Sequence, residues 1–108
     1  MKKLLIGLVM VASAAHAEFY SGNKLYSDLQ STSSSDNIFA MAYIAGVHDA
    51  EYGKQICTPT TVSLGQVSDV VKKALAEFPE YRNNSADLLT IVALQKVWPC
   101  KNKSKSSV

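Results

Sequence analysis

The sequence predicts an all-α protein, a compact bundle of about four helices closed by one disulfide bond. Four stretches of the chain repeat apolar residues at helical spacing. No alternation of apolar and polar residues, as in a β-strand, extends beyond a few positions. The chain holds two Cys, and an N-terminal leader directs it to a compartment where disulfides form. The helical domain is expected to span residues 18–100, a length that makes one domain rather than two.

Residues 1–17 resemble a cleaved secretory signal peptide. Lys2 and Lys3 form a short positive region, and the apolar stretch Leu4–Ala15 follows them. Ala15-His16-Ala17 then supplies the small residues of a cleavage site. The apolar stretch is too short to span a bilayer. We therefore expect the leader to be removed, leaving a secreted chain that begins at Glu18 and has no membrane contact.

The first helix is expected over residues 22–30, where Leu25 and Leu29 lie one turn apart. Its periodicity is the weakest of the four. A run of Ser and Thr, residues 31–35, follows it and is typical of an exposed loop. The first helix is thus expected to be joined to the rest by a short polar linker.

The second helix is expected to run from Asn37 to Tyr52. Asp36 is its predicted N-cap, and Gly53 is well placed as the residue that ends it. The apolar residues fall on more than one side of this helix, and small residues between them allow neighbours to approach closely. A helix that is apolar nearly all round is buried in a core or lies at an interface.

The third helix carries the clearest start signal. Ser63 and Gln66 stand three residues apart in a capping-box pattern. Apolar residues then recur at helical spacing, and Pro79 ends the helix. The fourth helix is expected to begin near Asn84 and to end before Pro99, with a broad apolar face in its middle.

The two Cys flank the last two helices, since Cys57 precedes the third and Cys100 follows the fourth. The connection between these helices, residues 79–83, is short, which predicts antiparallel packing and brings the two Cys together. A Cys57–Cys100 disulfide would close a loop of about 44 residues and contribute roughly 4 kcal/mol. The alternatives are two free buried thiols or a bond between chains.

Charge is unevenly distributed along the mature chain. Residues 18–100 contain six basic and nine acidic side chains, a net charge of −3. Lys101, Lys103 and Lys105 lie in the tail, residues 101–108, which is polar and predicted to be disordered. The negative body argues against nucleic-acid binding and suits a protein partner with a basic rim. An ordinary solvated surface is the alternative.

The sequence offers few residues for catalysis. His48 is the only His that remains once the leader is removed, and a zinc site needs three or four ligands. His48, Asp49 and Tyr52 are therefore expected at a helix end or in a dimer surface, and no metal, cofactor or catalytic residue is predicted. A catalytic or metal-binding corner that includes Glu51 is the alternative.

The connection between the last two helices is the predicted partner-binding element. It combines aromatic side chains with Arg, and these residue types often anchor interfaces. A plain link between helices is the alternative. The predicted contact residues are Phe78, Glu80, Tyr81, Arg82, Asn83 and Asn84.

Several short motifs follow one another along the chain. They are Tyr43-Ile44-Ala45-Gly46-Val47-His48-Asp49, Cys57-Thr58-Pro59, Val62-Ser63-Leu64-Gly65-Gln66-Val67, Phe78-Pro79, Ala93-Leu94 and Trp98-Pro99-Cys100. From about residue 22 to residue 100, their order resembles the Rap/Tai family of immunity proteins, which accompany type VI secretion effectors. The resemblance implies a helical periplasmic homodimer that performs no chemistry. Its implied partner is a peptidoglycan amidase with an NlpC-like cysteine-peptidase fold, whose cleft it blocks.

One departure from the family pattern concerns the first helix. Members of the family often carry an extra Cys pair, and the corresponding stretches here hold Asp28 and either Ala40 or Met41. The first helix is then attached less firmly, and the target can differ, as in a phage-borne inhibitor of another cell-wall hydrolase. An acid-activated periplasmic chaperone is the other alternative, since such proteins are also small, helical, dimeric and closed by a disulfide.

Overall fold

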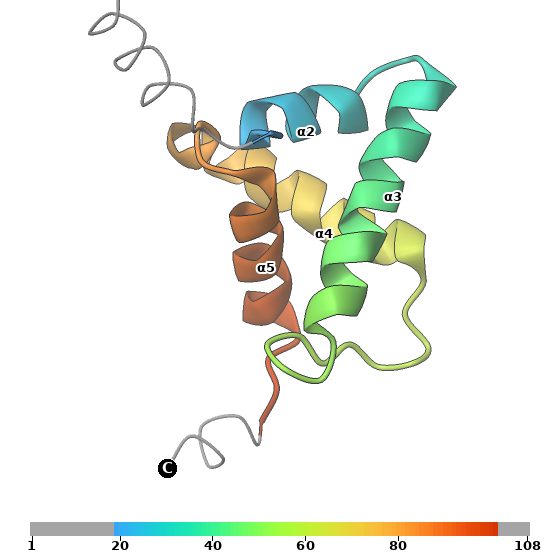
Figure 1. The fold of residues 1–108 in the computed structure, drawn as a ribbon, viewed down its shortest axis with the longest axis vertical. Coiled ribbons are helices and arrows are strands. Elements are labelled where there is room, and N and C mark those ends of the chain that lie inside the picture. Colours follow the sequence, from blue (N-terminus) through green and yellow to red (C-terminus); the bar gives the residue numbers. More distant parts are fainter. Residues whose placement is uncertain (1–18, 102–108) are drawn as a thin grey trace, which may run out of the picture.

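A computed structural model describes residues 19–101, which fold into four α-helices and one 3₁₀ turn. These elements are α2 (Gly22–Leu29), α3 (Ser34–Glu51), α4 (Leu64–Glu77), η1 (Pro79–Tyr81) and α5 (Ala86–Val97). Figure 1 shows α2 lying across the top of the molecule, α3 and α5 descending on either side, and α4 crossing behind them. The predicted all-α fold is confirmed. The predicted signal peptide and the tail beyond Lys101 lie outside the described residues.

The start of α3 differs from the expectation. The helix begins at Ser34 with Ser33 as its N-cap, so the predicted N-cap at Asp36 is wrong and the linker is shorter than expected. Asp36 lies instead in the first turn, where a carboxylate interacts favourably with the helix dipole. The Ser31 hydroxyl donates a hydrogen bond to this carboxylate at 2.8 Å, which fixes the turn between the two helices.

Two other helix ends agree with the sequence. The Gln66 amide donates to the Ser63 hydroxyl at 3.2 Å, and the Ser63 amide donates to the Gln66 side chain at 2.8 Å, so the capping box of α4 is confirmed. Gly53 follows α3 with a φ of 82°, a left-handed conformation that suits Gly after a helix. Its amide donates to the carbonyl of Ile56 at 2.8 Å, which turns the chain back and buries Ile56 completely.

The core is small and draws on every helix. α3 is the longest helix, yet only two of its residues are fully buried, and its Ile38 and Phe39 side chains are exposed. No helix within residues 19–101 is long and apolar enough to cross a membrane. The buried apolar residues are Leu25, Ala40, Ile44, Ile56, Val67, Val71, Leu75, Ala86, Ala93 and Leu94.

Polar contacts attach the C-terminal end of α2. The Asn37 side chain donates to the backbone carbonyls of Asp28 and Ser31 at 2.8 and 3.0 Å, and carbonyls at a helix end lack partners within the helix. The Asp28 carboxylate is buried and accepts hydrogen bonds from the Tyr20 hydroxyl at 2.6 Å and the Lys24 ammonium at 2.8 Å. Burial raises the pKa of Asp28, but these two hydrogen bonds outweigh burial and hold the pKa below its ordinary value.

The N-terminal end of α2 is pressed against the segment before α5. The Gly22 amide donates to the Asn84 carbonyl at 2.8 Å, and the Asn23 amide donates to the Arg82 carbonyl at 2.7 Å. A Cβ atom on Gly22 would overlap the Leu89 side chain and lie 2.8 Å from the Arg82 carbonyl oxygen. This close approach of two backbones therefore requires Gly at position 22. Because residue 84 is engaged here, α5 begins two residues later than expected.

The predicted disulfide between Cys57 and Cys100 is confirmed. The two Cα atoms are 5.0 Å apart, and the Cys57 amide donates to the Trp98 carbonyl at 2.9 Å. The route to this bond differs from the expectation, because α4 crosses behind α5 instead of running antiparallel to it (Figure 1). The loop between α3 and α4 carries Cys57 to the end of α5, so the bond ties this loop to the core.

We expect Gly22→Ala to lower the free energy of unfolding by about 1–3 kcal/mol, because the added methyl group overpacks the contact with Leu89 and Arg82. Gly65→Ala is the matched control. Its methyl group would meet only the Ser63 hydroxyl, at 3.7 Å, and the substitution should stabilise by about 0.4–1 kcal/mol. Urea unfolding followed by circular dichroism measures both variants. A Gly22→Ala protein as stable as the parent would contradict the proposed close contact.

Candidate functional site

The contact loop, which we define as residues 78–84, folds around the 3₁₀ turn η1. Pro79 occupies the first position of the turn, and the Tyr81 amide donates to the Phe78 carbonyl at 3.1 Å. The side chains of Phe78 and Tyr81 remain 42% and 55% exposed, with their ring centroids 6.3 Å apart. The loop thus presents two aromatic rings on a hydrogen-bonded turn.

The other predicted contact residues divide into two that shape the loop and two that face solvent. The Arg82 guanidinium is half-buried and lies 4.3 Å from the centroid of the Tyr26 ring. The Asn84 side chain donates to the Tyr81 carbonyl at 2.9 Å. Glu80 and Asn83 are exposed. The Arg82 side chain therefore holds the loop against α2 and the Asn84 side chain closes the loop on itself, whereas the side chains of Glu80 and Asn83 are available to a partner.

An apolar groove, which the sequence did not predict, lies between α4 and α5 beside this loop. We call it the α4–α5 groove, and its volume is about 210 Å³. The residues that line it are Ala74, Leu75, Phe78, Tyr81, Leu89, Val92, Ala93 and Lys96.

The pattern of α5 contained a signal for this surface. Leu88 and Val92 are one turn apart and 50% and 52% exposed, whereas Ala93 and Leu94 are buried. The broad apolar face predicted for this helix is therefore two faces, one inward and one outward.

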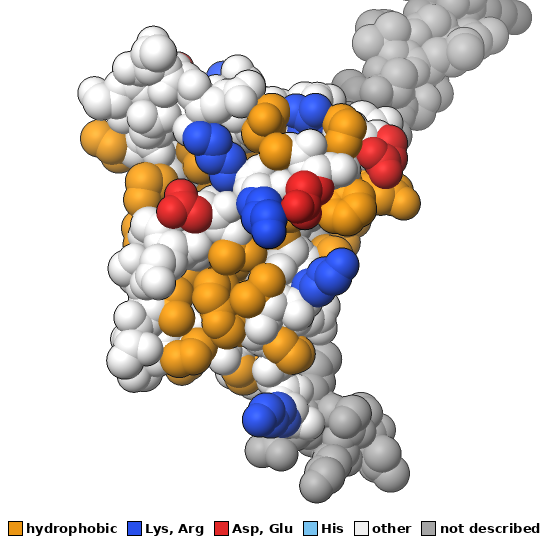
Figure 2. Space-filling view, turned by 180° about the vertical axis from the view of Figure 1, so that it is seen from behind, with side chains coloured by type: hydrophobic (Ala, Val, Ile, Leu, Met, Phe, Trp, Pro, Cys, Tyr) orange, Lys and Arg blue, Asp and Glu red, His pale blue; other side chains and the backbone are white. Residues whose placement is uncertain are grey.

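Figure 2 shows hydrophobic side chains gathered below a band of basic and acidic side chains, on the side of the molecule where α4 lies. Exposed apolar surface of this kind often marks an interaction site.

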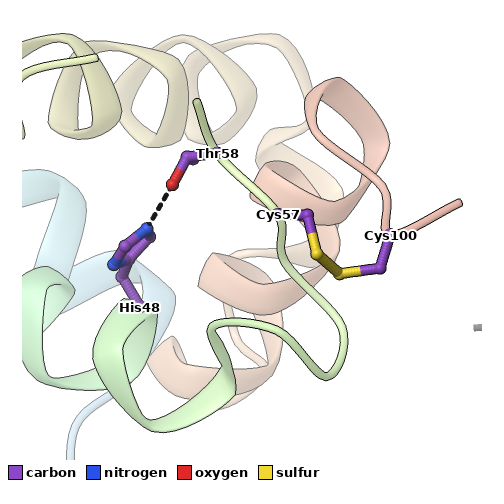
Figure 3. The surroundings of a disulfide bond; sticks show 4 residues. All are labelled: His48, Cys57, Thr58 and Cys100. Carbon is purple, nitrogen blue, oxygen red and sulfur yellow. Dashed lines mark hydrogen bonds between the residues drawn. A yellow bond between two sulfur atoms is a disulfide. The ribbon is translucent and has the colours of Figure 1, made fainter. Parts of the chain in front are cut away.

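His48 joins α3 to the loop that carries Cys57 (Figure 3). Its Nε2 atom lies 2.7 Å from the Thr58 hydroxyl, and its Nδ1 atom lies 3.0 Å from an Asp49 carboxylate oxygen. A carboxylate only accepts hydrogen bonds, so Nδ1 donates to Asp49, and in the neutral ring Nε2 accepts from Thr58. His48, in the last turn of α3, therefore fastens this helix to the loop that carries Cys57.

The same three residues have the connectivity of a hydrolase triad, but their exposure is reversed. In such a triad the carboxylate is buried and the hydroxyl is open to substrate. Here Thr58 is buried, at 7% exposure, and the Asp49 side chain is 80% exposed. Glu51 is engaged elsewhere, as it accepts from the Gln55 side chain at 2.8 Å. Within residues 19–101, no three His, Cys, Asp or Glu side chains are grouped to hold a metal.

The outward face of α3 is the second exposed apolar surface. Ile38 and Phe39 are 66% and 56% exposed, and the small residues Ala42, Gly46 and Ala50 continue this exposed face along the helix. Gly46 has open space where a Cβ atom would stand. A flat apolar helix surface of small residues allows another helix to approach closely.

The comparison with known families covers the whole helical region. Residues 21–100 match the family model of the Rap1a immunity proteins. The matched segment holds all four described helices and both Cys of the disulfide. No curated protein matches the sequence.

We expect His48→Ala to lower the free energy of unfolding by about 1–3 kcal/mol, because the buried Thr58 hydroxyl loses its partner. Adding Thr58→Val removes the orphaned hydroxyl, so the double variant should lose less than the sum of the two single losses. Asp49→Asn is the control and should change stability little, since its side chain is exposed. Chemical denaturation of the parent, His48→Ala, Thr58→Val and the double variant gives the cycle, and Asp49→Asn is measured beside them. Simple additivity would contradict a stabilising contact between His48 and Thr58.

Proposed function

The chain belongs to the Rap1a family of immunity proteins, and on that premise we propose that it is a periplasmic inhibitor of a peptidoglycan-degrading amidase effector. Immunity proteins bind cognate effectors and perform no chemistry of their own. In the proposed mechanism the contact loop enters the effector's active-site cleft, and the flanking helix surface supplies further area. Inhibition follows from exclusion of the cell-wall substrate.

The observation that carries this proposal is a braced, aromatic loop on a chain that matches an immunity family. Two backbone hydrogen bonds from α2 hold the loop, through the carbonyls of Arg82 and Asn84. Arg82 also packs on Tyr26. A loop that is already ordered loses little conformational entropy on binding. Tyr81 is the proposed anchor, because it is the most exposed large apolar side chain of the loop and Tyr is frequent among residues that dominate binding energy.

The periplasmic location is supported by two features. Residues 1–17 have the pattern of a cleaved signal peptide, and Cys57 and Cys100 form a disulfide, which is typical of an oxidising compartment. The family match favours an immunity protein over the acid-activated chaperone and over an enzyme. A different cell-wall hydrolase as target, including one of phage origin, is an outcome that the following experiment distinguishes.

The test uses the chain from Glu18 with its disulfide intact. It is mixed with purified cell-wall amidases of the NlpC-like class and, separately, with lysozyme-like hydrolases, and digestion of purified peptidoglycan is followed by turbidity. We expect stoichiometric inhibition of one amidase and a stable complex on size-exclusion chromatography. Inhibition of a lysozyme-like enzyme alone would replace the amidase as target. Suppression of client aggregation at low pH, without inhibition of any hydrolase, would contradict the immunity function.

Tyr81→Ala should weaken the complex with the inhibited enzyme by about 10- to 100-fold, because it removes a central aromatic contact. Leu64→Ala is the matched control, since Leu64 is also exposed (41%) but lies at the opposite end of α4. Isothermal titration calorimetry reports both affinities. Equal affinities for Tyr81→Ala and the parent would place the contact away from the loop.

We further propose that two copies of the chain associate through the outward face of α3. The small residues of that face and the exposed Ile38 and Phe39 support this. Gly46→Arg should convert a dimer into a monomer, because the long side chain blocks close approach of the two helices. Ala76→Arg, at an exposed position of α4, is the control and should stay dimeric. Sedimentation equilibrium measures the masses, and a monomeric parent protein at high concentration would contradict the dimer.

A further inference from the structure

We propose that the α4–α5 groove receives a protruding segment of the effector that carries one large apolar side chain and, within one or two residues of it, a carboxylate. The proposal rests on the proposed function, because it names the chemistry of the partner at the surface beside the contact loop. In this arrangement the inhibitor not only inserts its loop but also accepts a part of the enzyme. Three features of the groove support this chemistry: its lining, its single charge and its position.

The lining of the groove fits an apolar side chain. Val92, Phe78 and Tyr81 form its rim and are each about half exposed, while Leu75 and Ala93 form its floor and are buried. An engineered apolar cavity of about 150 Å³ holds a benzene molecule. The groove, at about 210 Å³, therefore has room for one aromatic or branched aliphatic side chain. An occupant of this size would remove the exposed rim from water, which is favourable in proportion to the apolar area covered.

Lys96 supplies the only charge in the lining of the groove. It stands one turn after Val92 and two turns after Leu88, so the three residues form one ridge on the outward side of α5. Its ammonium lies 5.9 Å from the centroid of the Phe78 ring. Among the described residues, salt bridges engage Lys24 and Lys73, whereas no carboxylate lies within 4.0 Å of Lys96. A cation at the edge of an apolar groove favours a partner with a carboxylate at that point.

The position of the groove favours the effector over other occupants. Phe78 and Tyr81 belong to both the contact loop and the groove, so a partner held by the loop already lies at its rim. The chain's own tail, residues 102–108, carries Lys103 and Lys105 and no acidic side chain, so its side chains offer no charge complementary to Lys96. A second copy of the chain would use a separate surface, the outward face of α3.

The test uses the ¹⁵N-labelled chain from Glu18 and two synthetic peptides, acetyl-Ala-Leu-Glu-Ala-amide and its neutral counterpart acetyl-Ala-Leu-Gln-Ala-amide. Each is titrated and followed by amide chemical shifts. We expect shifts confined to residues 74–96 that line the groove, with the acidic peptide binding at least threefold more tightly. Equal binding of the two peptides, or shifts located elsewhere, would overturn the proposal. Shifts in the groove that depend on protein concentration without peptide would assign it to a second copy instead.

Two variants make the result specific. Lys96→Gln should abolish the preference for the acidic peptide while leaving binding of the neutral peptide unchanged, because the apolar lining is intact. Lys72→Gln, an exposed Lys of α4 outside the groove, is the matched control and should keep the preference. Because no effector takes part, the result is independent of the amidase assay. Inhibition of an amidase without peptide binding in the groove would contradict the groove proposal and leave the proposed function intact. Peptide binding without inhibition of any amidase would confirm the binding preference of the groove but contradict the effector as its partner.

Discussion

Ten buried apolar residues, three of them Ala, form the core of residues 19–101. Because so small a core contributes little stabilising free energy, the fold depends on additional specific contacts. A domain of this size buries too little apolar surface to be stable by a wide margin. Specific contacts therefore hold each end of the molecule. At one end the disulfide and the His48–Thr58 contact fasten the loop after α3. At the other end Asn37 and the close contact at Gly22 fasten α2.

Most helix ends could be predicted from the sequence because they depend on neighbouring residues, whereas contacts between distant residues could be predicted only for the two Cys. The capping box at Ser63 and the end of α3 at Gly53 follow from local chemistry, and the pairing of the Cys follows from their number. The N-cap of α3 was missed because several Ser residues precede Asp36 and each can cap a helix. The packing of Arg82 on Tyr26 could not be predicted, because it joins residues 56 positions apart. The groove was missed because apolar periodicity alone does not say which side of α5 faces inward.

Hydrogen bonds contribute much of the attachment of α2. The buried carboxylate of Asp28 accepts from Tyr20 and Lys24. Such hydrogen bonds can open and reform, whereas a disulfide cannot without redox chemistry. The first helix is therefore attached through hydrogen bonds and the buried side chain of Leu25, and the amides of Gly22 and Asn23 hold the contact loop in place.

The disulfide also divides the chain topologically. Residues 57–100 form a closed covalent ring that contains α4, the contact loop and α5, whereas α2 and α3 lie outside it. A mechanical load applied between the chain ends therefore passes through the two sulfur atoms and bypasses the ring. Only the segments outside the ring can be drawn out, by at most about 3.3–3.6 Å per residue. The part of the molecule that bears the proposed binding surfaces beside α5 is thus shielded from tension by one covalent bond.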